Sequence, residues 1–305
     1  MSVVYLNGDY LQADRATVSV DDRGFLFGDG VYEVTAAYEG RLFRWPEHLR
    51  RLRRGLAGLG IDFAPDRLEP IQRELLVRNG LEDASVASIY VQVTRGVAPR
   101  SHAFPNPPVE PTVYGFANRY VRPARERWEE GFEAITVPDQ RWALAEIKAI
   151  ALVPNCLAQQ AATEAGVSDA IFVRDGIALE GSHNNLFCVF GGELATAPKS
   201  NYILPGITRD FVIELAAGLG IPVRERSIGL GELYGADEVF FTGTTTEVRP
   251  CVRVDGRPIG DGQVGPVARR LFDSFLAATG PPADGAPVTL RRSADLSGAG
   301  RNTAS

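Results

Sequence analysis

One lysine of this chain lies where it could support amine chemistry. The chain has thirty arginines but only two lysines, Lys148 and Lys199, and Lys148 lies within the apolar segment 145–152. Arginine stays protonated in proteins and cannot act as an amine nucleophile. Because desolvation disfavours the charged form of a lysine, Lys148 could lose its proton and form a Schiff base with a carbonyl. A lysine that simply extends its charged end to water is the ordinary alternative.

A carboxylate between two strand-like segments could pair with a protonated ring nitrogen. Glu180 begins the run Glu-Gly-Ser-His-Asn-Asn-Leu-Phe. A carboxylate raises the pKa of a heterocyclic nitrogen beside it, so the ring stays an electron sink, as pyridoxal phosphate (PLP) chemistry requires. The commoner role for such a residue is to cap its own hairpin turn.

Two segments are candidates for phosphate binding. Residues 206–209, Gly-Ile-Thr-Arg, open a predicted helix, where free N–H groups, the helix dipole and the Thr208 hydroxyl favour an anion. Residues 242–246, Thr-Gly-Thr-Thr-Thr, end a predicted strand, and Gly243 lets backbone amides turn towards a ligand. Each has an ordinary alternative, because a threonine at a helix start is commonly an N-cap and a threonine run is commonly strand.

The first part of the chain is predicted to hold these groups on strands and two helices. Leucines at helical spacing between Pro46 and Gly60 predict one helix, and a second follows around residues 68–75. The glycines of segment 24–30 predict turns, and the proline-rich segment 95–111 predicts a long ordered loop or lid. β-branched and aromatic residues predict strands at 3–6, 31–38, 88–94 and 112–117.

The second part mixes strands and helices without strict alternation, which favours an α+β fold over a doubly wound sheet. We expect a small N-terminal α/β domain at 1–120 that carries the long loop, a larger domain at 121–282 and a disordered tail at 283–305. A linker is predicted near 119–127. Strands are predicted at 132–137, 170–173, 185–190, 238–242 and 250–254, and helices near 155–165, 208–219 and 264–279.

Composition argues against several classes of function. The formal charge of −6 disfavours nucleic-acid and anionic-membrane surfaces. The start of the chain does not resemble a signal peptide, and no apolar run is long enough to span a membrane. The cysteines, Cys156, Cys188 and Cys251, form no zinc or disulfide pattern, and we expect reduced, buried thiols in a cytoplasmic protein without a metal site.

Together these motifs resemble those of the fold-type IV PLP enzymes. Lys148, Glu180 and the segments at 206–210 and 242–247 occur in the order and spacing of that family. The resemblance covers residues 1 to about 280 and implies a homodimer whose larger domain has a barrel-like β core. The family includes branched-chain aminotransferases, D-amino-acid aminotransferases and aminodeoxychorismate lyases. Segments 22–34 and 93–105 look like D-amino-acid aminotransferase specifically.

The resemblance implies a role for each candidate residue. Lys148 would hold PLP as a Schiff base and move the proton between Cα and C4′, while Glu180 would pair with the pyridine nitrogen. The substrate α-carboxylate would be bound partly across the dimer interface, by Tyr32, Arg100 and His102; without the resemblance, Arg-Ser-His would be read as an exposed loop. The cofactor phosphate would be bound by Arg51, Ile207, Thr208, Gly243 and Thr244.

Two positions depart from the family's pattern. His183 stands where relatives mostly carry a small residue, which would alter pocket size and substrate range. Gly243 replaces a hydroxyl residue near the phosphate but can still offer its amide. Arg141, shortly before Lys148, is expected near the cofactor.

The resemblance implies a PLP-dependent D-amino-acid aminotransferase. It would pass the amino group of D-alanine or a similar D-amino acid to 2-oxoglutarate, by a ping-pong route through pyridoxamine phosphate. A branched-chain L-amino-acid aminotransferase or an (R)-amine transaminase is the nearest alternative, although such enzymes usually lack the Arg-x-His loop at residues 100–102. An aminodeoxychorismate-type lyase and a non-catalytic PLP-binding protein are further alternatives.

Overall fold

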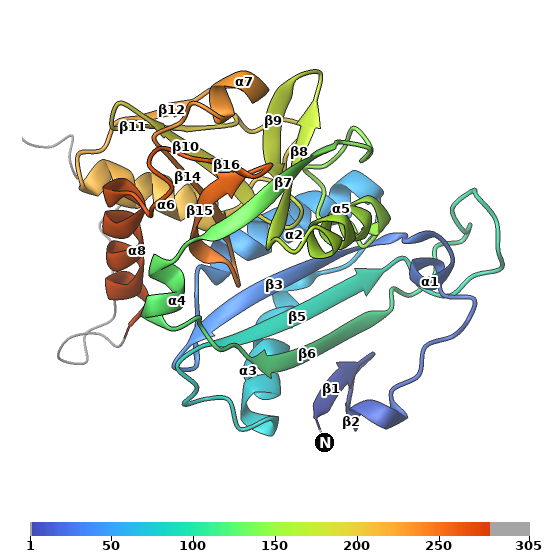
Figure 1. Ribbon diagram of the computed structural model, residues 1–305. Helices are drawn as coiled ribbons and strands as arrows, with labels where there is room; N and C mark the ends of the chain where they lie inside the picture. Colours follow the sequence, from blue (N-terminus) through green and yellow to red (C-terminus); the bar gives the residue numbers. More distant parts are fainter. Residues whose placement is uncertain (1, 281–305) are drawn as a thin grey trace, which may run out of the picture.

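The computed structural model describes residues 2–280, so the predicted tail at 283–305 lies outside the described residues. Two β-sheets, each with helices packed against it, form this part of the chain (Figure 1). Strands and helices do not alternate regularly along the sequence, which confirms the predicted α+β class. The first sheet uses strands before residue 120 and the second uses strands after residue 131. Division into domains at 1–120 and 121–282 stays a prediction.

The first sheet is antiparallel throughout and has the strand order β2-β1-β6-β5-β3-β4. Helices α2 (Trp45–Leu59) and α3 (Leu68–Arg78) pack on it, and their leucines join its buried core. Pro46 lies in the first turn of α2, and Gly60 ends the helix in the left-handed conformation, as predicted. The strands are β1 (Val3–Leu6), β2 (Asp9–Gln12), β3 (Gly30–Tyr38), β4 (Arg41–Leu42), β5 (Ala87–Thr94) and β6 (Val113–Arg119).

The second sheet closes on itself. Its strand order is β12-β11-β10-β14-β15-β7-β8-β9-β13, with β16 beside β15, and β9 also pairs with β10. Six strands therefore form a barrel-like core, while α6 (Ile207–Gly218) and α8 (Pro266–Thr279) pack on one side of it. The strands are β7 (Phe132–Pro138), β8 (Asp169–Arg174), β9 (Ile177–Gly181), β10 (Asn185–Phe190), β11 (Glu193–Thr196), β12 (Val223–Glu225), β13 (Ile228–Gly229), β14 (Glu238–Gly243), β15 (Glu247–Val254) and β16 (Arg257–Pro258).

Some sequence predictions were wrong or incomplete. Segment 24–30, predicted as turns, contains a short helix, α1 (Arg23–Phe27), because the Asp22 carboxylate caps it by accepting a 2.7 Å hydrogen bond from the backbone N–H of Gly24. The linker near 119–127 runs into another short helix, α4 (Arg125–Glu129). Cys188 and Cys251 are buried, as predicted, but Cys156 is exposed in the first turn of α5 (Val153–Glu164).

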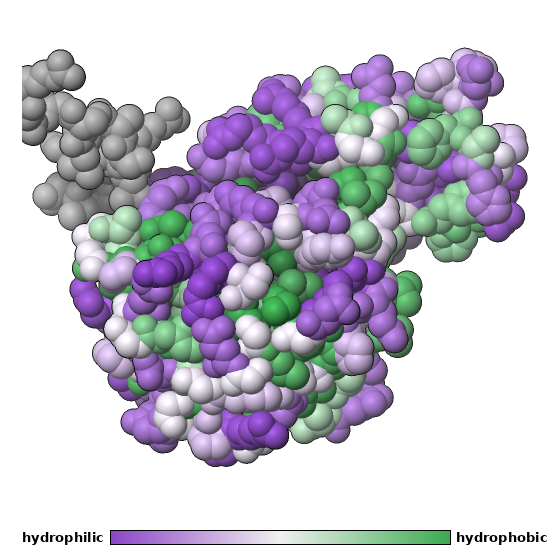
Figure 2. All heavy atoms as spheres, turned by 90° about the horizontal axis from the view of Figure 1, so that it is seen from above, coloured by the Kyte–Doolittle hydropathy of each residue, from purple (hydrophilic) through white to green (hydrophobic). Residues whose placement is uncertain are grey.

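The face of the molecule seen from above is mixed in character. Figure 2, the view from above, shows hydrophilic and hydrophobic side chains distributed in small patches over this face. Within residues 2–280, no helix combines the length and the apolar character that crossing a membrane requires.

Candidate active site

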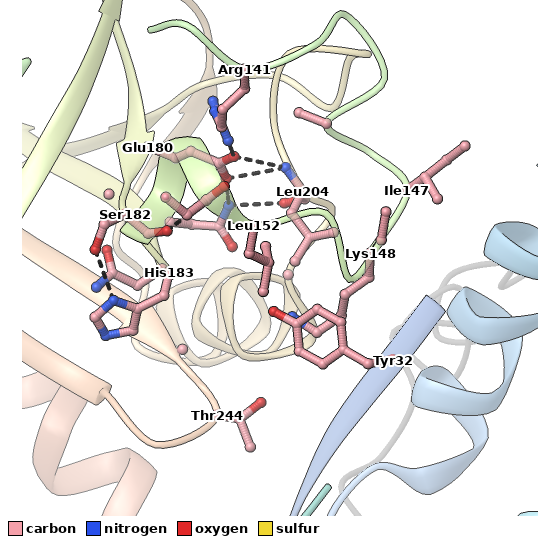
Figure 3. Close-up of a pocket in the computed structure, with 18 of the residues that line it drawn as sticks. Tyr32, Arg141, Ile147, Lys148, Leu152, Glu180, Ser182, His183, Leu204 and Thr244 are labelled. Carbon is pink, nitrogen blue, oxygen red and sulfur yellow. Dashed lines mark hydrogen bonds and ion pairs between the residues drawn. The ribbon is translucent and has the colours of Figure 1, made fainter. Parts of the chain in front are cut away.

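Segments far apart in the sequence enclose one cavity of about 520 Å³, a volume typical of small-molecule sites. Its walls come from β3 and α2 of the first sheet's layer, from the segment between β7 and α5, and from the rim of the barrel. Figure 3 shows Glu180 and Arg141 at one end, Thr244 at the opposite end, and Lys148 beside Tyr32 along one side. The cavity brings together these predicted site residues: Tyr32, Arg51, Lys148, Glu180, Ile207, Thr208, Gly243 and Thr244.

Lys148 lies on an irregular segment that is fixed to β3. Its carbonyl oxygen accepts a 3.0 Å hydrogen bond from the backbone N–H of Tyr32, and Ala149 forms a β-bridge with Val31. The ammonium nitrogen Nζ lies 4.2 Å from the centroid of the Tyr32 ring, inside the cavity. The lysine is half-buried between Ile147 and Ala149, so its amine is presented to a bound ligand from a fixed backbone.

Glu180 is buried at the end of β9 and is held by several donors. Its carboxylate pairs with the guanidinium of Arg141, accepts a 2.9 Å bond from Nδ2 of Asn185 and accepts 3.1 Å bonds from the backbone N–H of Leu204. Burial raises the pKa of Glu180 to about 7, even though the positive charge of Arg141 opposes that shift. A protonated ring nitrogen nearby would return this carboxyl group to its charged form.

Arg141 lies against Glu180, at the end of the cavity where it was expected. It also pairs with Asp139 at 2.9 Å and donates a 3.0 Å hydrogen bond to the carbonyl of Tyr202. Two carboxylates therefore share one buried guanidinium, which fixes the position of the Glu180 side chain.

The other end of the cavity is built to receive an anion. Helix α6 begins at Ile207 with no side chain capping its first turn, so free N–H groups point outward there. Arg51 reaches the same region and donates a 3.1 Å hydrogen bond to the carbonyl of Pro205. The buried hydroxyl of Thr242, beside Gly243, has no hydrogen-bond partner among the described residues. These unused donors fit a phosphate group.

Two residues that position Arg51 were missed by the sequence analysis. Glu33 is fully buried and accepts 2.7 Å hydrogen bonds from Nε and Nη2 of Arg51, while its Oε2 lies 2.7 Å from Nδ1 of His48. Burial alone would raise the pKa of Glu33, but the charges and hydrogen bonds of Arg51 and His48 together outweigh it and hold the pKa well below its usual range. Burial also lowers the pKa of His48, although Glu33 opposes the shift. The sequence did contain a signal for this cluster. Glu33 is an acidic residue inside a predicted strand, and His48 and Arg51 have the spacing that places them on one face of the predicted helix.

The structure does not bring Arg100 and His102 into this cavity. Both are exposed on the loop after β5, where they lie near Phe27: the Arg100 guanidinium is 5.2 Å from its ring centroid and the His102 ring 5.7 Å. Arg23 anchors the loop through a 2.6 Å hydrogen bond from Nη1 to the carbonyl of Ser101. Within one chain, therefore, Tyr32 is separated from the other two residues of the expected carboxylate site.

Known proteins resemble this chain over most of its length. The family model described as amino-transferase class IV matches residues 30–254. A D-alanine aminotransferase of Staphylococcus haemolyticus is 40% identical over 277 residues, which cover 90% of this chain and 97% of the relative. A D-alanine aminotransferase of Bacillus licheniformis is 38% identical over 282 residues, which cover 90% of this chain and 98% of the relative.

Solved structures of aminotransferases have the same fold as this chain. A branched-chain amino acid aminotransferase of T.th., solved with pyridoxamine 5′-phosphate, superposes with a TM-score of 0.83 at 32% identity, covering 91% of this chain and 94% of that one. The branched-chain amino acid aminotransferase from Escherichia coli superposes with a TM-score of 0.83 at 29% identity, and the match covers 92% of this chain and 94% of that one.

Proposed function

The chain belongs to the class IV amino-transferase family, and we propose that it transfers the amino group of D-alanine and other D-amino acids to 2-oxoglutarate. PLP is the cofactor, and the reaction follows a ping-pong route through pyridoxamine phosphate. The observation that carries the proposal is the presence of Lys148 and Glu180 in one cavity whose far end offers unused anion donors. The two D-alanine aminotransferases named above match this chain over nearly their whole length. This similarity favours a D-amino acid as the substrate.

Each of the main residues of the cavity has a separate role in the proposed reaction. PLP, when bound, supplies a ring that withdraws electrons from the substrate Cα. The Lys148 amine would hold the cofactor through its aldehyde and would move the proton between Cα and C4′, while ionised Glu180 would keep the ring nitrogen protonated. Arg51, aligned by Glu33, would bind the phosphate together with the first turn of α6 and the amides at Gly243 and Thr244.

We further propose that the enzyme works as a homodimer in which Arg100 and His102 of one copy complete the cavity of the other. Both side chains are exposed and lie outside the lining of their own cavity, as such an arrangement requires. Large apolar side chains are exposed on the same loop and on α1, where a second copy would cover them: Phe25, Val97 and Phe104. We expect the enzyme in the cytoplasm.

A branched-chain L-amino-acid aminotransferase is the second candidate, because the solved structures named above are branched-chain enzymes. The exposed Arg-x-His loop favours the D-amino acid instead. An (R)-amine transaminase keeps the same cofactor chemistry. A lyase of the aminodeoxychorismate type differs from all of these because it releases pyruvate without a keto-acid acceptor.

The experiment that tests the proposal is a pair of single-turnover titrations. The PLP-loaded enzyme is mixed with D-alanine or, separately, with L-alanine, and its absorption spectrum is recorded. We expect the visible band of the lysine-bound cofactor to convert to the pyridoxamine form with D-alanine alone. Conversion by L-amino acids alone would move the function to the branched-chain type, and absence of the band would refute the cofactor assignment for Lys148.

A further inference from the structure

One ionisable side chain of the cavity, His183, has no part in the proposed chemistry. It lies in the turn between β9 and β10 and lines the cavity on the side opposite Tyr32 and Lys148 (Figure 3). The imidazole is exposed to the open space, and Nδ1 lies 2.8 Å from Oγ of Ser182. The structure gives Nε2 no hydrogen-bond partner among residues 2–280, so this nitrogen is available to a ligand.

The turn that carries His183 is fixed by a buried carboxylate. Asp169, at the start of β8, accepts hydrogen bonds from the backbone N–H and the hydroxyl of Ser182, at 3.1 Å and 2.8 Å, and from the side-chain amide of Asn184. The first turn of α5 holds the other side, because Nδ2 of Asn155 donates a 2.7 Å hydrogen bond to the carbonyl of Ser182. The imidazole therefore projects from a rigid support.

The hydrogen bonds also fix which nitrogen of His183 carries the proton. Nε2 of Gln159 donates to the carbonyl of Ser168, so its Oε1 faces the Ser182 hydroxyl, where Oδ1 of Asp169 lies as well. The single hydroxyl proton has three possible acceptors, these two oxygens and Nδ1 of His183, and the charged carboxylate is the strongest of them. Nδ1–H of His183 consequently donates to Ser182, which leaves Nε2 as a basic nitrogen connected to Asp169 through one hydroxyl.

The charges around the imidazole favour an anionic ligand. Desolvation lowers the pKa of His183, Arg249 and Lys148 lower it further by repulsion, and Asp169 opposes them. The lowered pKa favours the neutral form of the imidazole in the ligand-free protein. A carboxylate beside Nε2 would draw a proton onto that nitrogen from solvent and receive a charge-assisted hydrogen bond from it.

We propose that His183 is a specificity-determining residue that binds the distal carboxylate of dicarboxylic substrates. The enzyme then favours 2-oxoglutarate and D-glutamate over the corresponding monocarboxylic compounds that lack only the distal carboxylate. This inference rests on the proposed transamination, since it assigns a second binding contact to substrates whose amino or keto end is held at Lys148.

Calorimetric titration of the PLP-loaded enzyme with unreactive acids tests the inference directly. Glutarate carries the distal carboxylate and butyrate lacks it, and each is titrated near pH 6 and near pH 8 in buffers of different ionisation enthalpy. We expect glutarate to bind about tenfold more tightly than butyrate at the lower pH, with uptake of up to one proton per site. The preference should decline as the pH rises.

The His183→Asn variant should lose both the preference for glutarate and the proton uptake while keeping its affinity for butyrate. Cys156→Ser is the matched control, because Cys156 is the other ionisable residue of the cavity without an assigned role, and it should behave like the parent enzyme. The visible cofactor band verifies that each variant is folded and loaded, and His183→Gln replaces the asparagine variant if that band is lost.

Three results would overturn the inference. They are equal affinity for both acids in the parent enzyme, an unchanged preference in the His183 variant, and an equal loss of both acids in that variant. Each can be told apart from failure of the proposed function, which would appear as absence of D-amino-acid turnover in the parent enzyme. Retained turnover of D-alanine with no preference for glutarate overturns the role of His183 alone.

Discussion

Glu180 and Asn185 are paired residues of β9 and β10, at the point where the second sheet closes into its barrel-like core. Nδ2 of Asn185 donates one hydrogen bond of 2.9 Å to Glu180 and another of 2.9 Å to the carbonyl of Leu204. Leu204 in turn donates its N–H to the carboxylate. The closure of the barrel and the position of the Glu180 carboxylate are therefore set by the same contacts.

The raised pKa of Glu180 predicts how the stability of the cofactor-free enzyme depends on pH. A carboxyl group with an ordinary pKa of 4.5 and a folded pKa of about 7 binds more protons in the folded state between those values. Its contribution to stability is therefore present at low pH and declines as the pH rises towards 7, by about 3 kcal/mol at most. Urea unfolding of the cofactor-free enzyme between about pH 5 and about pH 8 measures this.

Glu180→Gln is the control for that prediction. Glutamine keeps the size of the side chain and removes the ionisation, so the other titrating groups cancel in the difference between the two proteins. The free energy of unfolding of the parent enzyme should fall relative to the variant as the pH rises. A difference that is flat across this range would contradict the raised pKa.

Replacement of Lys148 by alanine should abolish the covalent link to the cofactor. We expect the half-reaction with D-alanine to slow by at least about a thousandfold, because the variant loses both the nucleophile and the proton carrier. Reduction of the loaded enzyme with borohydride, followed by peptide mass spectrometry, should find the cofactor adduct on Lys148 in the parent enzyme.

Lys199 provides the matched control, since it is the only other lysine of the chain and pairs with Asp210 at an exposed position. Lys199→Ala should keep both the adduct and the rate. An adduct on Lys199 would overturn the assignment.

The sequence singled out Lys148 and Glu180 as candidates from local patterns, an isolated lysine and a carboxylate between strands, and the family resemblance gave them roles. Both residues line the cavity, and their roles stay predictions. Glu33 and His48 could not be identified in this way, because the contact between them joins β3 to α2, two elements that meet only in the folded chain. The short helix α1 was missed for a related reason: five residues rich in glycine carry little helical pattern, and the Asp22 cap decides the outcome.

Replacement of Glu33 by glutamine should destabilise the protein and loosen the phosphate end of the cavity. The variant leaves the buried guanidinium of Arg51 without its charged partner, a loss of about 3 kcal/mol or more in the free energy of unfolding. Because the pKa of Glu33 is lowered in the folded state, this contribution is present above the ordinary carboxyl pKa and is lost as the pH falls through the folded value.

Urea unfolding near pH 7 and a titration with PLP measure the two effects of the Glu33 variant. Glu47→Gln is the control, since Glu47 forms an ion pair with Arg50 on the outer face of α2 and should contribute less than about 1 kcal/mol. Equal stability of the Glu33 variant and the parent enzyme would show that Arg51 does not depend on this carboxylate.

Coexpression of two impaired variants, assayed at a substrate concentration that the Arg100→Ala enzyme cannot use efficiently, tests whether Arg100 acts across a dimer interface. Arg100→Ala should weaken substrate binding without changing the cofactor band, because its side chain lies outside its own cavity. A mixed dimer of Arg100→Ala and Lys148→Ala chains would contain one complete cavity, with Lys148 from one copy and Arg100 from the other. Random pairing of equal amounts should then restore about a quarter of the parent activity. If each cavity used its own Arg100, both cavities of the mixed dimer would be defective, and the coexpressed sample would be no more active than the two variants separately.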